Sequence, residues 1–92
     1  MERDTLKQRA YKLKSRYNIT LQDFDNLLEK QAASCGVCFK PFEPSAVKNV
    51  DHCHTAGKVR GIVCTNCNLA LGHLKDFPEV AESAANYLRR HE

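Results

Sequence analysis

A chain of 92 residues is long enough for one small domain and too short to bury a large apolar core. Its net charge of +3, from 14 basic and 11 acidic side chains, is too small to indicate a nucleic-acid partner by itself. We see no membrane-spanning run and no signal peptide, so we expect a cytoplasmic protein with reduced thiols. The five cysteines are therefore predicted to serve metal binding rather than disulfides.

Two helices are predicted in the first third of the chain. Apolar side chains recur at helical spacing over residues 3–17 and again over residues 21–33. Thr20 and Asp23 form a capping signature in front of the second helix. The first helix is rich in Lys and Arg, so it could lie along a phosphate backbone or present only a solvated face. We interpret residues 1–33 as a helical lead-in.

The middle of the chain, residues 35–74, is predicted to be a core held together by zinc. A strand over residues 46–52, a turn over 55–58 and a returning strand over 59–64 form a hairpin between two Cys-x-x-Cys pairs. A short helix follows the second pair and extends to about residue 73. Four thiolates make a closed tetrahedral site, which is typical of structural zinc. The four predicted ligands are Cys35, Cys38, Cys64 and Cys67. The fifth cysteine, Cys53, is predicted to be a buried packing residue.

An Asp-His-x-His sequence lies inside this core, at the end of the first predicted strand. His52 and His54 would share one face of the strand, whereas Asp51 would point away unless the strand ends or bulges there. Asn68 lies on the short helix, which the zinc site would pin against the hairpin. Carboxylate and amide oxygens suit a hard cation such as Mg²⁺, and a neutral histidine is a competent general base near pH 7. The alternative is that Asp51 and His54 only form hydrogen bonds within the hairpin.

A last helix is predicted over residues 76–91. Asp76 is expected to cap it, with Pro78 and Glu79 in its first turn. Its buried stripe is expected to consist of Val80, Ala84, Tyr87 and Leu88. We assign no catalytic or metal-binding role to Asn66, His73 or His91.

Three segments of the chain resemble the phage recombination endonuclease VII family of HNH, or His-Me finger, nucleases. They are Asp-His-Cys-His at 51–54, Gly-Lys-Val-Arg-Gly-Ile-Val-Cys at 57–64 and Cys-Asn-Leu-Ala-Leu-Gly at 67–72. Residues 17–38 and 76–91 are similar to the lead-in and the final helix of that family, so the resemblance covers nearly the whole chain. It implies a small α+β fold, in which a ββα-metal core with a structural four-cysteine zinc site is flanked by N-terminal helices and a C-terminal helix.

The resemblance also implies a function: a single HNH endonuclease domain over residues 1–92 that hydrolyses DNA phosphodiester bonds with one Mg²⁺ or Mn²⁺ ion. Carried over by position, Asp51 and Asn68 would hold this cation. His52 would be the general base that activates water, and His54 would orient the site or contact the scissile phosphate. Cleavage, by nicking or by cutting both strands, would leave a 5′ phosphate and a 3′ hydroxyl.

Several expectations about the substrate and partners follow. Lys58 and Arg60 are predicted to contact DNA phosphates, or else to be two exposed strand cations. The chain ends soon after its last helix, which favours a simpler DNA-cutting enzyme over a Holliday-junction resolvase. A non-catalytic zinc module that binds nucleic acid is the alternative from another class. The protein would act in the host cytoplasm during phage infection, as a monomer or dimer and with packaging or recombination proteins as further partners.

Overall fold

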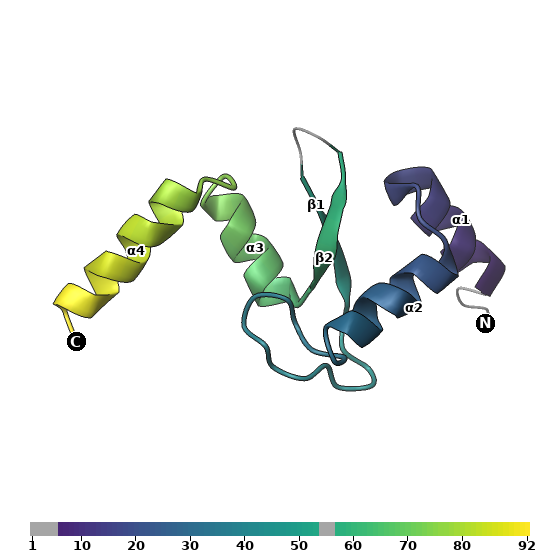
Figure 1. Ribbon diagram of the computed structural model, residues 1–92, viewed down its shortest axis with the longest axis horizontal. Coiled ribbons are helices and arrows are strands. Elements are labelled where there is room, and N and C mark those ends of the chain that lie inside the picture. Colours follow the sequence, from purple (N-terminus) through teal and green to yellow (C-terminus); the bar gives the residue numbers. More distant parts are fainter. Residues whose placement is uncertain (1–5, 54–56) are drawn as a thin grey trace.

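A computed structural model describes residues 6–53 and 57–92 of the chain. The elements are α1 (Leu6–Tyr17), α2 (Leu21–Lys30), β1 (Asn49–His52), β2 (Val59–Val63), α3 (Thr65–His73) and α4 (Pro78–Arg90). The β1–β2 hairpin stands between the two N-terminal helices and α3, and α4 extends away from this body (Figure 1). The predicted α+β architecture is therefore confirmed. None of the helices in the described residues has the length and apolar character needed to cross a membrane.

Helix α2 begins as predicted and ends earlier than predicted. The Asp23 amide donates to the Thr20 hydroxyl and the Thr20 amide donates to the Asp23 carboxylate, both at 3.0 Å. These reciprocal bonds satisfy amides that the first helical turn leaves without a partner. At the other end, Ala32 and Ala33 have φ values of 56° and 55°, a left-handed turn that no helix can continue. The helix therefore stops at Lys30 rather than near residue 33.

The hairpin is shorter than predicted and contains a bulge. Strand β1 begins at Asn49 rather than at residue 46, because the chain still turns at Ala46, whose amide donates to the Glu43 carbonyl. Asp51 pairs with Gly61 and His52 pairs with Val59, so one extra residue of β2 lies between these two pairs. Residues 55 and 56 of the predicted turn over 55–58 lie outside the described residues.

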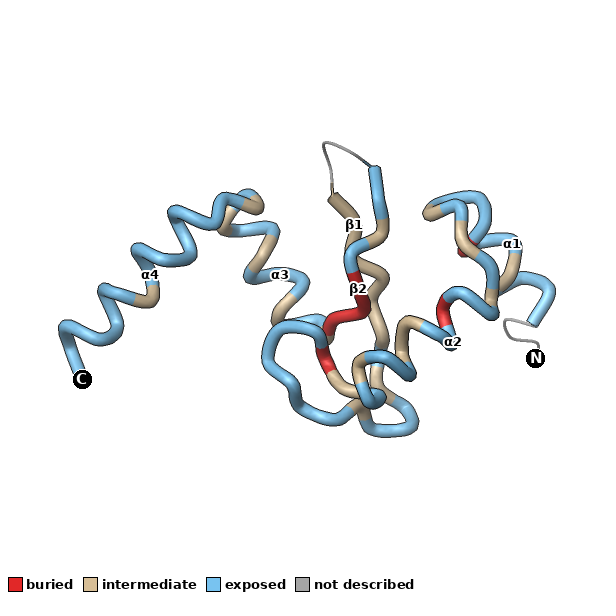
Figure 2. The backbone as a smooth tube through the Cα atoms, viewed as in Figure 1, coloured by how far each residue is buried: buried red, intermediate tan, exposed pale blue. Residues whose placement is uncertain are grey.

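The core is small and centres on the hairpin. Leu13, Phe24 and Ile62 form its buried cluster, and Ile62 is wholly inaccessible to solvent (Figure 2). The outer edge of β2 is closed by a side chain: Gln31 accepts from the Ile62 amide at 2.9 Å and donates to the Ile62 carbonyl at 2.8 Å. A Cβ atom on Gly61 would lie 3.0 Å from the Gln31 Oε1, so glycine makes room for this contact. The Gln31 side chain thus attaches the lead-in helices to the hairpin.

The prediction of a buried stripe on α4 was wrong. Val80, Tyr87 and Leu88 are 43%, 57% and 66% exposed, Ala84 is exposed as well, and no residue of α4 is buried (Figure 2). The helix leaves the body after a left-handed turn in which Asp76 has a φ of 60°. Asp76 is therefore not the cap, as was predicted. The N-cap is Phe77, which makes no side-chain capping bond.

Candidate functional site

Four cysteine thiols meet where the turn after α2 lies against the start of α3. The Sγ atoms of Cys35, Cys38, Cys64 and Cys67 all lie within 4.8 Å of one another, and those of Cys38 and Cys64 are 4.0 Å apart. Tetrahedral zinc with bonds of about 2.3 Å requires sulfur atoms roughly 3.8 Å apart, so the cluster is close to that size. Cys64 is also the N-cap of α3 and accepts from the Cys67 amide at 3.4 Å. The four predicted ligands are therefore together, in an arrangement suited to a metal ion.

The pKa of the Cys35 thiol lies below the value usual for cysteine. Burial alone would raise its pKa, but the backbone amides of Cys38, Cys64 and Val37 point at the sulfur and lower the pKa to about 6. The Val37 and Cys64 amides donate to it at 3.4 Å and 3.3 Å. Burial and hydrogen bonds with the other three thiols raise the pKa of Cys67 to about 12. A second thiolate next to that of Cys35 therefore needs a cation to balance its negative charge, and a divalent metal ion supplies that charge.

Asp51, at the end of β1, is ion-paired with Arg60 of β2. The Arg60 Nε donates to one carboxylate oxygen at 2.7 Å and Nη2 donates to the other at 2.9 Å, which is the two-pronged geometry of a strong pair. The bulge makes Arg60 the extra residue of β2. Its guanidinium also donates to Asp76 at 3.4 Å, and its hydrogen bonds to Asp51 raise its pKa. Arg60 and Lys58 are both exposed, but Arg60 is engaged by two carboxylates.

Strand β1 and helix α3 face each other beside this ion pair. The Asn49 side chain donates to the Thr65 hydroxyl at 3.2 Å and ties the base of β1 to the first turn of α3. Asp51 is on the same face of β1 as Asn49, two residues further on. Asn68 is on the same face of α3 as Thr65, three residues further on. Asp51 and Asn68 therefore lie on facing surfaces, although the described residues show no direct bond between them. The ion pair between Arg60 and Asp76 also connects β2 to the turn after α3.

His52 lies against α1. Its ring centroid is 5.6 Å from that of Tyr17, with the two rings tilted by 56°. His54 lies outside the described residues. Cys53 is half-buried rather than fully buried, and its amide donates to the Lys58 carbonyl at 2.7 Å. From the sequence, Tyr17 was predicted only to belong to the apolar stripe of residues 3–17. Its position beside His52 was missed, because helical spacing does not show what a helix packs against.

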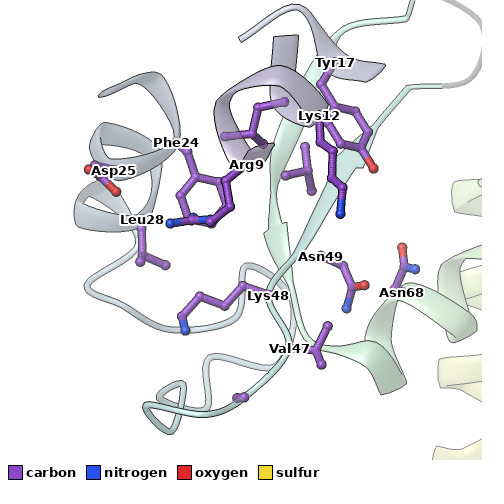
Figure 3. Close-up of a pocket in the computed structure, with 13 residues that line it drawn as sticks. Arg9, Lys12, Tyr17, Phe24, Asp25, Leu28, Val47, Lys48, Asn49 and Asn68 are labelled. Carbon is purple, nitrogen blue, oxygen red and sulfur yellow. The ribbon is translucent and has the colours of Figure 1, made fainter. Parts of the chain in front are cut away.

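A cleft of about 750 Å³ borders these residues. It lies between α1, α2 and the segment that leads into β1, and it extends to Asn68 of α3 (Figure 3). Asn49 and Asn68 border it from β1 and α3, and Tyr17 borders it from α1. Asn68 therefore belongs both to the cleft and to the junction with Asp51. Tyr17 lines the cleft and contacts the candidate base His52. Nothing in the sequence pattern indicated the cleft, because its walls come from four separate segments.

Two relatives of this chain are phage proteins. The chain is 36% identical over 75 residues to the gene 59 protein of Mycobacterium phage D29 and 36% identical over 73 residues to that of Mycobacterium phage L5. These alignments cover 80% and 78% of this chain but 46% and 44% of the relatives. The chain thus spans about half the length of the curated relatives that it matches.

A solved structure and a family model agree with the predicted fold. The chain is similar to the ββα-Me type II restriction endonuclease Hpy99I, with a TM-score of 0.61 and 29% identity, over 77% of this chain and 40% of that one. The hairpin followed by α3 is the ββα unit of that fold, and the four cysteines cluster at its base. The model of the family described as recombination endonuclease VII matches residues 10–90. The chain belongs to the recombination endonuclease VII family.

Proposed function

We propose that the protein is a metal-dependent HNH nuclease that hydrolyses phosphodiester bonds of DNA. The observation that carries this proposal is the contact of β1 with α3 through the Asn49–Thr65 hydrogen bond. By strand and helix periodicity, Asp51 follows Asn49 on the same face of β1 and Asn68 follows Thr65 on the same face of α3, and His52 is next to Asp51 in the chain. Membership of a family described as recombination endonuclease VII supports it, as does the similarity to a ββα-Me restriction endonuclease. The phage origin of the relatives supports action inside an infected cell.

The residues of the junction have the chemistry that such a reaction requires. Asp51 and Asn68 would hold a divalent cation, Mg²⁺ or Mn²⁺, through the carboxylate and amide oxygens that hard cations prefer. When bound, that cation would stabilise negative charge on the phosphate and on the leaving oxygen. His52 in its neutral form would accept the proton of the attacking water, and the Tyr17 ring would limit the orientations of its imidazole. His54 would orient the site or contact the scissile phosphate, and Lys58 would contact a neighbouring phosphate.

The four-cysteine cluster would bind zinc in a structural role. All four ligand positions are filled by protein thiols, so no position remains open for water or substrate. The cluster joins the turn after α2 to the N-cap of α3, and it therefore fixes the helix that carries Asn68 relative to the hairpin that carries Asp51.

Arg60 would position the Asp51 carboxylate for the cation. Replacing Arg60 with Ala is expected to weaken Mn²⁺ binding by about 10-fold, which is typical of losing a partner that orients a metal ligand. The reason is that the two guanidinium bonds fix the direction of both carboxylate oxygens. Titration of the zinc-loaded protein with Mn²⁺, followed by electron paramagnetic resonance, measures the change. Lys58→Ala, in the same hairpin, is the matched control and should bind Mn²⁺ normally. Unchanged or tighter binding by Arg60→Ala would contradict the positioning role.

A plasmid cleavage assay tests the function directly. The zinc-loaded protein is incubated with supercoiled plasmid and Mg²⁺ or Mn²⁺, and we expect nicked or linear product that disappears when EDTA is added. Because EDTA also competes for zinc, circular dichroism of the same sample must show that the fold persists. A folded protein that binds DNA but leaves the plasmid intact with both metals would favour the non-catalytic zinc module. Branched DNA assayed beside linear duplex tests the Holliday-junction alternative.

A further inference from the structure

We infer that the cleft between α1, α2 and residues 46–50 is the docking surface for the sugar-phosphate backbone of the DNA strand beside the cleavage site. This inference rests on the proposed nuclease function and deepens it, because it names the surface through which the Asp51–Asn68 junction receives its substrate. Three observations carry it: the position of the cleft, the charges that line it and the apolar part of its lining.

The cleft lies beside the candidate cleavage site, where a DNA strand would enter. β1 pairs with β2 along one edge, and Asn49 and Val50 of β1 line the cleft. Asn68 of α3 borders the cleft opposite α1, and Lys12 and Tyr17 come from α1 (Figure 3). A chain of phosphates along the cleft would therefore have Asn68 on one side and Tyr17, whose ring contacts His52, on the other.

Positive charge is concentrated in the cleft. Arg9, Lys12 and Lys48 line it, against one carboxylate, that of Asp25. The whole chain has a net charge of only +3, so these three cations make a local positive field that the mild overall charge conceals. A concave surface lined by one sign of charge attracts a polyanion more strongly than the same charges spread over a convex face. The charges of the cleft thus complement a phosphate backbone.

Two of these cationic side chains lie against aromatic rings and not against carboxylates. The Arg9 guanidinium lies 5.7 Å from the centroid of the Phe24 ring, and the Lys48 ammonium lies 5.7 Å from that of Phe42. No carboxylate of the described residues forms an ion pair with either side chain. A ring face restrains a cation without using its N–H donors, so these donors can still bind phosphate oxygens.

Part of the lining of the cleft is apolar. Leu28, Val47 and Val50 line it together with the charged side chains. Deoxyribose presents carbon atoms between successive phosphates and can cover such a lining, whereas inorganic phosphate alone would leave it exposed to water. An acidic peptide is the other polyanion that could bind here. The DNA backbone is favoured because the cleft is continuous with the candidate cleavage site.

Salt-dependent DNA binding tests the inference without depending on cleavage. Binding of a fluorescently labelled duplex is measured by anisotropy in EDTA over a series of salt concentrations, with circular dichroism as a check on the fold. The cleft variants are Arg9→Gln, Lys12→Gln and Lys48→Gln. The matched controls are Lys14→Gln and Arg16→Gln, which remove exposed cations of α1 that do not line the cleft.

Each cleft variant is expected to weaken binding several-fold and to reduce the slope of log K against log salt by about 1, as the loss of one phosphate contact does. Each control should change the affinity by less than about 2-fold and leave the slope unchanged. Equal losses in the cleft and control variants, or no loss in either, would overturn the inference, as would stronger competition by polyglutamate than by unlabelled DNA. If the plasmid stays intact while the cleft variants lose binding, the nuclease proposal fails and the docking surface stands.

Discussion

Zinc-free protein is expected to lose its folded structure. Only five side chains of the described residues are buried apolar ones, Leu13, Phe24, Cys35, Ile62 and Val63, and one of them belongs to the cysteine cluster. Structural zinc contributes roughly 10–16 kcal/mol in small zinc-binding peptides at neutral pH. The net stability of a folded domain is only about 5–15 kcal/mol, so the loss of zinc should exceed what this core can supply. The site should unfold with it, because α3 is capped by Cys64.

The comparison of two single cysteine variants separates zinc from other effects of substitution. Cys38→Ser removes a ligand at an exposed position, so it leaves no core cavity and should unfold the protein only through loss of the metal. Cys53→Ser changes the one cysteine outside the cluster and should retain the fold and one zinc per chain. Zinc content, far-ultraviolet circular dichroism and urea unfolding measure the outcome. A cooperative transition and an unchanged spectrum in zinc-free protein would rule out the structural role.

Features set by local sequence were predictable. The spacing of the two Cys-x-x-Cys pairs predicted the thiol cluster, and Thr20 with Asp23 predicted the start of α2. The cap depends on residues three positions apart, and each Cys-x-x-Cys pair is equally local, although the two pairs lie 26 residues apart between Cys38 and Cys64. The motif at residues 51–54 and the segments after it predicted the family and the ββα fold.

Features set by packing were not predictable. The spacing of Val80, Tyr87 and Leu88 showed that they share a face of α4, but spacing does not show whether another element covers that face, and none of the described elements does. Arg60 was expected to contact a phosphate or to be an exposed strand cation, and it is exposed on β2. Its ion pair with Asp51 beside the bulge was not expected, because an alternating strand pattern gives no sign of a bulge.

His52→Ala is expected to reduce plasmid cleavage by about 100- to 10,000-fold, which is the contribution typical of a general base. His52 is only half-buried, and β1 pairs through its backbone, so the variant should retain zinc and fold. It should also retain the DNA affinity measured in EDTA, because the cations of the cleft are untouched. Loss of the reaction with binding unchanged is the result that a proton acceptor predicts and that a purely structural histidine does not.

A second histidine provides the matched control for this experiment. His73 is exposed in the last turn of α3 and has no proposed part in the reaction, so His73→Ala should cut plasmid at the normal rate. His52→Gln keeps a polar side chain of similar length beside Tyr17 but cannot accept a proton near neutral pH, so it should be as inactive as His52→Ala. If His52→Gln cleaves at the normal rate, the ring pair with Tyr17 is structural and the base must be sought elsewhere. If both His52 variants are inactive while folded and DNA-bound, the imidazole itself is required for the reaction.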